Sequence, residues 1–287
     1  MVETLLKELE ETENPENIIK LIDEIISIKP EIKEKLLLKK AVAYKNLENY
    51  EKAIKYYKEF EKYSPADEKY MLLLEIAECY ENLEENEKEM EYLIKSFNLH
   101  PTDYSHKKII VTYYLNHEYR KCISFIENLK EKNLADIEDL INLTYCYNHC
   151  NDPKNAISCA EQVIELDPKN IDMYITLTIS YESLGDMEKL METYRKIVEL
   201  DVDEDEQSLL IISQAYMGLE EEEKSFETID KAIKLNPYDP MTHIMKGMLY
   251  QAVNNEEAAL ECFEEANKLD PELLKLMIDQ QIINNNF

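Results

Sequence analysis

Apolar residues recur along most of this chain at intervals of three and four positions, the spacing that places side chains on one face of an α-helix. In the segment 34–67, Leu37, Ala41 and Tyr44 share one such face, and a second apolar run begins at Ala53 after a short polar stretch. The pattern predicts two amphipathic helices joined by a turn.

Prolines mark the ends of the predicted helix pairs. Proline lacks a backbone N–H and disfavours helical backbone in the residue before it, so it closes a helix. Pro65 follows the pair in 34–67, and comparable prolines follow other apolar runs: Pro30, Pro101, Pro168, Pro237 and Pro271. With only 3 Gly and 9 Pro in 287 residues, helices with short turns are favoured over a Gly-rich sandwich or barrel.

A tyrosine recurs late in the first helix of each predicted pair. Its positions are 33 to 36 residues apart: Tyr44, Tyr80, Tyr114, Tyr147, Tyr181, Tyr216 and Tyr250. A small residue often stands three positions earlier, where it lets two helices approach closely: Ala41, Ala77, Ser213 and Gly247. A fixed period of this length predicts an array of repeats, each in contact with its neighbours.

This pattern resembles the tetratricopeptide repeat, a helix–turn–helix unit of about 34 residues. The resemblance covers nearly the whole chain and implies an all-α fold, a right-handed superhelical solenoid of antiparallel helix pairs. We expect a degenerate first repeat at 1–33 and a C-terminal capping helix and tail at 272–287. Between them we expect seven units: 34–69, 70–103, 104–136, 137–170, 171–205, 206–239 and 240–271.

The family also places a small residue early in the second helix of each unit. This chain follows that preference at most of the corresponding positions: Ala53, Cys122, Ala156, Ser225 and Ala259. Glu89 and Leu190 depart from it.

In the family, the first helices line a concave face that binds peptides or helices of partner proteins. A clamp for a C-terminal carboxylate needs basic residues at inward positions, and among the positions it uses here only Lys108 is basic. In the C-terminal half, the residues at or beside inward positions are apolar instead: Ile175, Ile179, Leu210, Met217, Met241, Ile244, Met245 and Met248. Methionine adapts to varied apolar partners. These residues predict a groove for an amphipathic helix; burial by tight superhelical packing is the alternative.

Apolar residues surround the last predicted helix on all sides: Leu273, Leu274, Leu276, Met277, Ile278, Ile282 and Ile283. Such a helix requires burial on more than one side. It could dock on its own chain, dock on a neighbouring copy to make a homodimer, or form a partly disordered tail. The sequence leaves these alternatives open.

The formal net charge of −29 narrows the class of partner. A surface this acidic repels the phosphates of nucleic acids and anionic lipids, so neither is expected to bind. A basic segment or an apolar protein surface is the expected ligand. Two stretches, 31–62 and 104–133, are nevertheless locally basic, and the surroundings of Lys39 and Lys108 are the next place to expect a contact.

The sequence contains no nucleophile motif and no phosphate-binding glycine loop, so we expect a non-catalytic interaction scaffold without cofactor or metal. Cys146, His149 and Cys150 lie close in sequence, but His149 points away if the two thiols converge on one ion. The start of the chain does not resemble a signal peptide, and scattered cysteines are typical of a reducing compartment, so a cytoplasmic location is expected. A self-assembling array is the alternative function.

Overall fold

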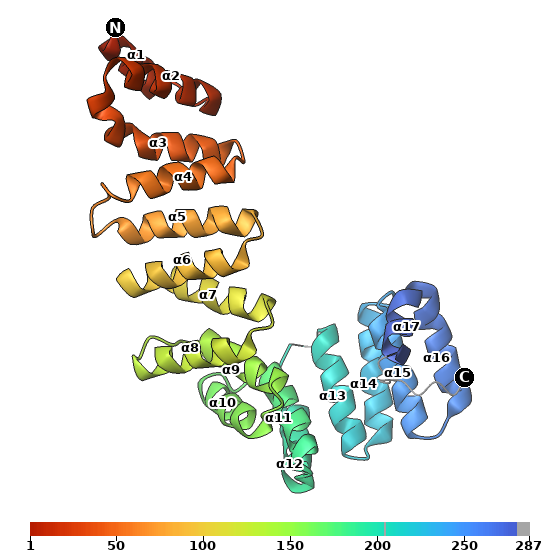
Figure 1. Ribbon diagram of the computed structural model, residues 1–287. Helices are drawn as coiled ribbons and strands as arrows, with labels where there is room; N and C mark the ends of the chain where they lie inside the picture. Colours follow the sequence, from red (N-terminus) through yellow and green to blue (C-terminus); the bar gives the residue numbers. More distant parts are fainter. Residues whose placement is uncertain (204, 280–287) are drawn as a thin grey trace. The chain divides into compact units, whose positions relative to one another are not determined.

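The computed structural model describes residues 1–203 and 205–279, and every regular element among them is helical (Figure 1). The predicted all-α fold is therefore confirmed for the described residues. The chain divides into two compact units, Met1–Phe125 and Ile126–Phe287, and the boundary falls within α8 (Tyr119–Glu131). Each unit is a series of helix pairs in which consecutive helices lie side by side (Figure 1).

The first unit holds the helices that precede α8. They are α1 (Val2–Glu11), α2 (Pro15–Ile28), the 3-10 helix η1 (Pro30–Ile32), α3 (Lys33–Asn46), α4 (Tyr50–Phe60), α5 (Lys69–Asn82), α6 (Asn86–Leu99) and α7 (Asp103–Leu115). An apolar cluster joins α1, α2 and α3 through Leu9, Ile22, Ile25 and Leu36. The N-terminal segment thus contributes a helix pair of its own.

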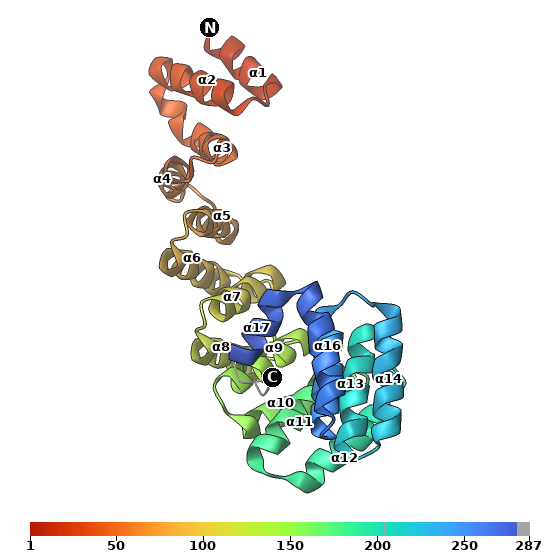
Figure 2. The same cartoon turned by 90° about the vertical axis from the view of Figure 1, so that its right-hand side faces the viewer.

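The second unit holds the helices that follow α8. They are α9 (Ile137–His149), α10 (Pro153–Leu166), α11 (Ile171–Leu184), α12 (Met187–Glu199), α13 (Glu206–Gly218), α14 (Glu222–Leu235), α15 (Pro240–Ala252), α16 (Glu256–Leu269) and α17 (Pro271–Asp279). Within this unit α13 lies beside α14, and α17 lies beside α16 (Figure 2). Among the described residues, no helix is both long and apolar enough to cross a membrane.

Local sequence signals determine where these helices begin and end. At the start of α2, Asn14 Oδ1 accepts a hydrogen bond of 2.9 Å from the Asn17 amide, which satisfies one of the unpaired N–H groups of the first turn. Asp152 caps α10 in the same way, at 3.3 Å from the Asn155 amide. At the other end, α10 stops at Leu166, two residues before Pro168.

The turn within a helix pair places one residue in the left-handed backbone region. These residues are Glu48, Glu84, His117, Asn151, Gly185, Glu220 and Asn254, with φ between 54° and 69°. Only Gly185 among them lacks a Cβ, so the other turns carry a conformational cost of about 1 kcal/mol or more each.

Small residues set the spacing between the helices of a close pair. In α13–α14, the Ser213 hydroxyl donates to the Ser225 carbonyl at 2.9 Å, and the Ser225 hydroxyl donates to the Ser213 carbonyl at 2.8 Å. In α15–α16, a Cβ added at Gly247 would lie 2.6 Å from the Phe263 ring. The two backbones can therefore approach closely only because these side chains are short or absent.

The pair α11–α12 is packed more loosely than the pairs α9–α10, α13–α14 and α15–α16. Its second helix carries Leu190 at the repeat position that Ala156, Ser225 and Ala259 occupy elsewhere. Leu190 is buried in the apolar cluster that joins α10, α11, α12 and α13. A branched side chain at this point holds the two helices apart.

The last helix, α17, packs on its own chain. Leu274 is buried in a cluster with Phe263, and Leu273, Met277 and Ile278 pack against the same cluster. The exception is Leu276, which remains 50% exposed. Ile282 and Ile283 lie outside the described residues.

Candidate functional site

The eight residues predicted to form the groove come from the first helices of three successive pairs. Ile175 and Ile179 lie on α11, Leu210 and Met217 on α13, and the others on α15. All three helices belong to the second unit, in which α13 contacts α15 and shares an apolar core cluster with α11. The eight side chains therefore occur on adjacent elements of one compact body.

Their exposure is unequal. Ile179 is 56% exposed, although it is a large apolar residue, whereas Ile244 is completely buried. Ile244 belongs to the cluster that α17 covers, and Met248 packs against that cluster. The C-terminal helix thus occupies the end of the predicted groove, and Ile244 can support a ligand only as part of the core behind the surface.

The remaining groove residues are partly exposed. They are Ile175, Leu210, Met217, Met241 and Met245. Ile175 packs against the core cluster of α10 to α13 with part of its surface. Between α13 and α15, the Gln214 amide lies 3.6 Å from the Met245 sulfur. With Ile179, these five residues are the members of the predicted groove that keep contact with solvent beside Met248.

The lysines of the two basic stretches are largely engaged within the first unit. Lys45 pairs with Glu75 at 2.8 Å and with Glu78 at 2.6 Å, and Lys108 pairs with Glu81 at 2.5 Å. The Lys39 ammonium donates to the backbone carbonyl of Leu9 at 2.5 Å. These lysines join one repeat to the next, which lowers their availability for an acidic ligand.

The first unit contains an apolar cavity that sequence reasoning did not assign. It measures about 260 Å³ and lies between α3, α4 and α5. Leu38, Val42 and Met71 reach it with 39%, 39% and 47% of their surface exposed, and Phe60 lines it as well. Leu38 and Val42 stand at inward positions of their repeat, so the same positional rule could have found this second apolar surface.

The thiols have the character of core residues. Cys146 and Cys159 are buried, and burial raises the pKa of Cys159 to about 11 and that of Cys79 to about 12. Because the thiolate is the nucleophile and the metal ligand, these cysteines are poor candidates for either role at neutral pH. Cys150 follows the last turn of α9 and is partly exposed.

Comparison with known proteins supports this description of the repeats. A family model of the tetratricopeptide repeat matches five segments, 34–67, 140–170, 171–203, 206–239 and 242–273. No curated protein sequence matches the chain. A solved tetratricopeptide repeat protein from Parabacteroides merdae ATCC 43184 is similar, with a TM-score of 0.54 and 14% identity over 87% of this chain and 99% of that chain.

Two further solved structures resemble the chain. The hetero-tetramer of the APC/C containing Cut9 and Hcn1 gives a TM-score of 0.50 at 12% identity, over 94% of this chain and 53% of that chain. A thermophilic tetratricopeptide repeat protein of Thermus thermophilus gives 0.49 at 17% identity, over 63% and 98%. The family model matches more than half of the residues, and the chain belongs to the tetratricopeptide repeat family, whose arrays are generally scaffolds for protein–protein interaction.

Proposed function

We propose that this protein binds an amphipathic helix or peptide segment of a partner protein on the face formed by α11, α13 and α15. The observation that carries the proposal is the 56% exposure of Ile179, together with the partial exposure of Leu210, Met217 and Met245 on the next two first helices. Repeated large apolar residues in contact with water on adjacent helices mark an interaction surface more often than an ordinary solvated face.

The proposed ligand presents an apolar side to these residues. Removing apolar surface from water contributes about 25 cal/mol per Å², and flexible methionines adjust to the shape of the incoming side chains. The polar side of the ligand is expected to be basic, because the net charge of −29 attracts cationic segments and accelerates their association. The ligand is thus an apolar helix face flanked by lysine or arginine.

The fold is compatible with partner binding of this kind. One similar chain was solved as part of a hetero-tetramer, in which a protein of this fold is assembled with another. A ligand on the face of the first helices requires no change in the second helices, which form the opposite side of each pair.

A charge-insertion experiment tests the proposal. The groove variant carries Ile179→Glu, Met217→Glu and Met245→Glu on α11, α13 and α15. A matched control carries Met187→Glu, Leu235→Glu and Leu260→Glu, which add the same charge on α12, α14 and α16 at residues 59%, 58% and 42% exposed. Met248 is left intact because it packs against the cluster beneath α17.

The measurement is capture of partners from native lysate by each variant, after circular dichroism has shown equal helicity. The groove variant should lose a captured partner by at least about tenfold, since each buried charge costs more than the 1.4 kcal/mol that corresponds to a factor of ten. The control should retain the same partner. Equal capture by both variants would exclude this face.

Self-assembly through α17 is the second candidate function. Leu276 is 50% exposed on a helix whose other described apolar side chains pack on the same chain. If the array dimerises here, its mass in solution should double with concentration, and Leu276→Glu should restore the monomer. A mass that stays monomeric at all concentrations removes this candidate.

A further inference from the structure

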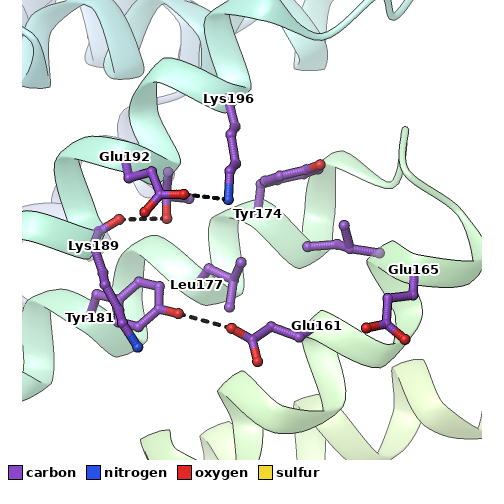
Figure 3. A pocket seen from close by; sticks show the side chains of 10 residues that line it. Glu161, Glu165, Tyr174, Leu177, Tyr181, Lys189, Glu192 and Lys196 are labelled. Carbon is purple, nitrogen blue, oxygen red and sulfur yellow. Dashed lines mark hydrogen bonds and ion pairs between the residues drawn. The ribbon is translucent and has the colours of Figure 1, made fainter.

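The second unit contains a cavity of about 430 Å³ between α10, α11 and α12, shown in Figure 3. Its floor is formed by Tyr174, Leu177 and Tyr181 of α11, and Ile164 of α10 lies beside them. Charged side chains of α10 and α12 border it on two sides (Figure 3). The volume lies within the range of about 300 to 1,000 Å³ that is typical of small-ligand sites.

This cavity lies on the side of α11 opposite to the proposed binding face. Tyr174, Leu177 and Tyr181 follow one another at helical spacing, and Ile175 and Ile179 lie on the other side of the same helix. A ligand in the cavity would therefore contact residues that the proposed amphipathic helix does not touch. The two sites can be tested separately.

The cavity follows from the loose packing of α11 against α12. Where a small residue stands early in the second helix, as Ser225 does in α14, the two backbones approach closely enough for mutual hydrogen bonds with Ser213. Leu190 takes that position in α12, and it is only 4% exposed. Its bulk keeps α12 away from α11, and the cavity borders Tyr174, Leu177 and Tyr181, which expose 6%, 6% and 5% of their surface.

The wall formed by α10 is acidic. Glu161 and Glu165 are four residues apart and so share one face of the helix, and both point towards the cavity in Figure 3. The Tyr181 hydroxyl donates to Glu161 Oε1 at 3.2 Å. Burial, followed by the charge of Glu161, raises the pKa of Tyr181 to about 12, so the hydroxyl stays protonated and orients that carboxylate.

The wall formed by α12 is basic, but its charges are already engaged. Lys196 pairs with Glu192 at 2.8 Å, and the Lys189 ammonium lies 5.3 Å from the centre of the Tyr181 ring. Within the described part of the chain, neither Glu161 nor Glu165 pairs with a cation. The unmatched charge around the cavity is therefore negative and lies at the end formed by α10.

We propose that this cavity is a second docking site, which takes an arginine side chain of a basic partner segment. The apolar stem of arginine fits along Ile164, Leu177 and Tyr174, and its charged end reaches the carboxylates of Glu161 and Glu165. Charge complementarity favours this occupant, because both the rim at α10 and the protein as a whole, with a net charge of −29, are acidic. The scaffold then holds basic segments on two opposite faces.

The test uses the full chain and a defined probe, the peptide acetyl-Ala-Ala-Arg-Ala-Ala-amide. A second peptide carries citrulline in place of arginine and has the same shape without the charge. Binding is followed by the methyl resonances of Ile164 and Leu177, which report on the cavity, and of Met217 and Met245, which report on the opposite face. We expect saturable shifts of the first two, and at least fivefold weaker binding of the citrulline peptide.

Two variants with the same loss of charge provide the control. Glu165→Gln removes one carboxylate of the cavity, and Glu227→Gln removes an exposed carboxylate of α14, away from it. Glu165→Gln should weaken binding of the arginine peptide by about threefold to fivefold, as expected for one exposed ion pair. Glu227→Gln should leave the affinity unchanged. Neither residue pairs with a cation within the described residues, so both variants should fold.

The inference would be overturned by unchanged Ile164 and Leu177 resonances, by equal binding of the citrulline peptide, or by equal weakening in the two variants. Shifts confined to Met217 and Met245 would also overturn it, because they would assign the basic segment to the opposite face. The outcome is independent of the proposed function, since the groove variant with Glu at 179, 217 and 245 leaves every residue of the cavity intact.

Discussion

The neighbouring helix pairs α11–α12 and α13–α14 differ in how closely their two helices pack. In α13–α14, Ser213 and Ser225 each donate a hydrogen bond to the backbone carbonyl of the other, which locks the helices at short range. In α11–α12, Leu190 occupies the equivalent position and the helices stay further apart. One side chain per repeat therefore decides whether a pair is closed or borders a cavity.

A third pair shows that size alone does not decide the spacing. Glu89 takes the same repeat position in α6 and is 4% exposed, yet α5 and α6 pack closely. Its carboxylate accepts a hydrogen bond of 3.2 Å from the Thr112 hydroxyl of α7, so the unbranched side chain extends towards the next repeat. Leucine, branched at Cγ, fills the space between its own two helices instead.

The largest effect is expected from placing leucine in the closed pair. Ser225→Leu removes both serine contacts and forces a branched side chain into a completely buried site. The lost hydrogen bonds and the overpacking together should lower the free energy of unfolding by about 3 kcal/mol. Urea unfolding of the full chain measures this loss. Stability within about 0.5 kcal/mol of the wild type would refute the explanation based on this position.

Replacing the leucine of the open pair by a small residue should lower the free energy of unfolding by less than is usual for a buried leucine. Leu190→Ala removes a buried side chain, which typically costs about 2 to 5 kcal/mol when the surroundings cannot relax. We expect α12 to move towards α11 in the variant, and the loss should then be only about 1.5 kcal/mol. Movement of α12 should also close the cavity at Leu177, and the arginine peptide should then bind at least about fivefold more weakly. A full loss in urea unfolding with unchanged peptide binding would show that α12 does not move.

A smaller effect is expected where the closed pair depends on glycine. Gly247→Ala would bring a methyl group to 2.6 Å from the Phe263 ring, which is itself 2% exposed. Overpacking typically costs about 1 to 3 kcal/mol and opposes a helix-propensity gain of about 1 kcal/mol, so the net loss should be about 1 kcal/mol. Thermal unfolding provides the measurement. A higher melting temperature would mean that the ring has room to move.

The smallest effect concerns the charge of Glu89. Burial, and then the neighbouring charge of Glu81, raise the pKa of Glu89 above its ordinary value, while Lys108 and the hydroxyl of Thr112 oppose the shift. A raised pKa means that the folded protein binds more protons than the unfolded one, so stability falls as pH rises from about 4.5 through the raised value.

Glu89→Gln keeps an acceptor for Thr112 and removes this titration. Relative to the wild type, the variant should gain stability as pH rises from about 4.5 through the raised pKa of Glu89, and it should keep that gain at higher pH. Urea midpoints at several pH values measure the difference. Thr112→Val should instead enlarge the loss of stability with rising pH, because it removes the hydroxyl that opposes the raised pKa of Glu89. A difference that does not change with pH would contradict the assignment of this shift to Glu89.

The fold could be predicted from the sequence because its signals are local and repeated. The tyrosines at a period of 33 to 36 residues, the small residues three positions before several of them, and prolines such as Pro168 predict helix pairs, and the helices occur there. The exposure of the site could not be predicted in the same way. Ile179 and Ile244 obey the same positional rule, but one is exposed and the other is covered by the cluster under α17.

The cavity between α10, α11 and α12 could not be predicted from the sequence either, because it depends on how side chains pack. Leu190 and Glu89 both depart from the small residue of the family, and composition does not distinguish them. Only the direction of each side chain separates the closed pair α5–α6 from the open pair α11–α12. A backbone displacement of this kind depends on packing between elements, which periodicity does not encode.

The left-handed backbone conformation of the turn residues lowers the melting temperature of the array. Glu48, Glu84 and Glu220 hold a backbone conformation that glycine adopts freely, and Gly185 already does so in the equivalent turn of its pair. Glycine at the three sites would relieve the strain and remove three negative charges from a chain of net charge −29. Thermal stability can therefore be raised by substitutions at the turns alone, without changing any residue of α11, α13 or α15.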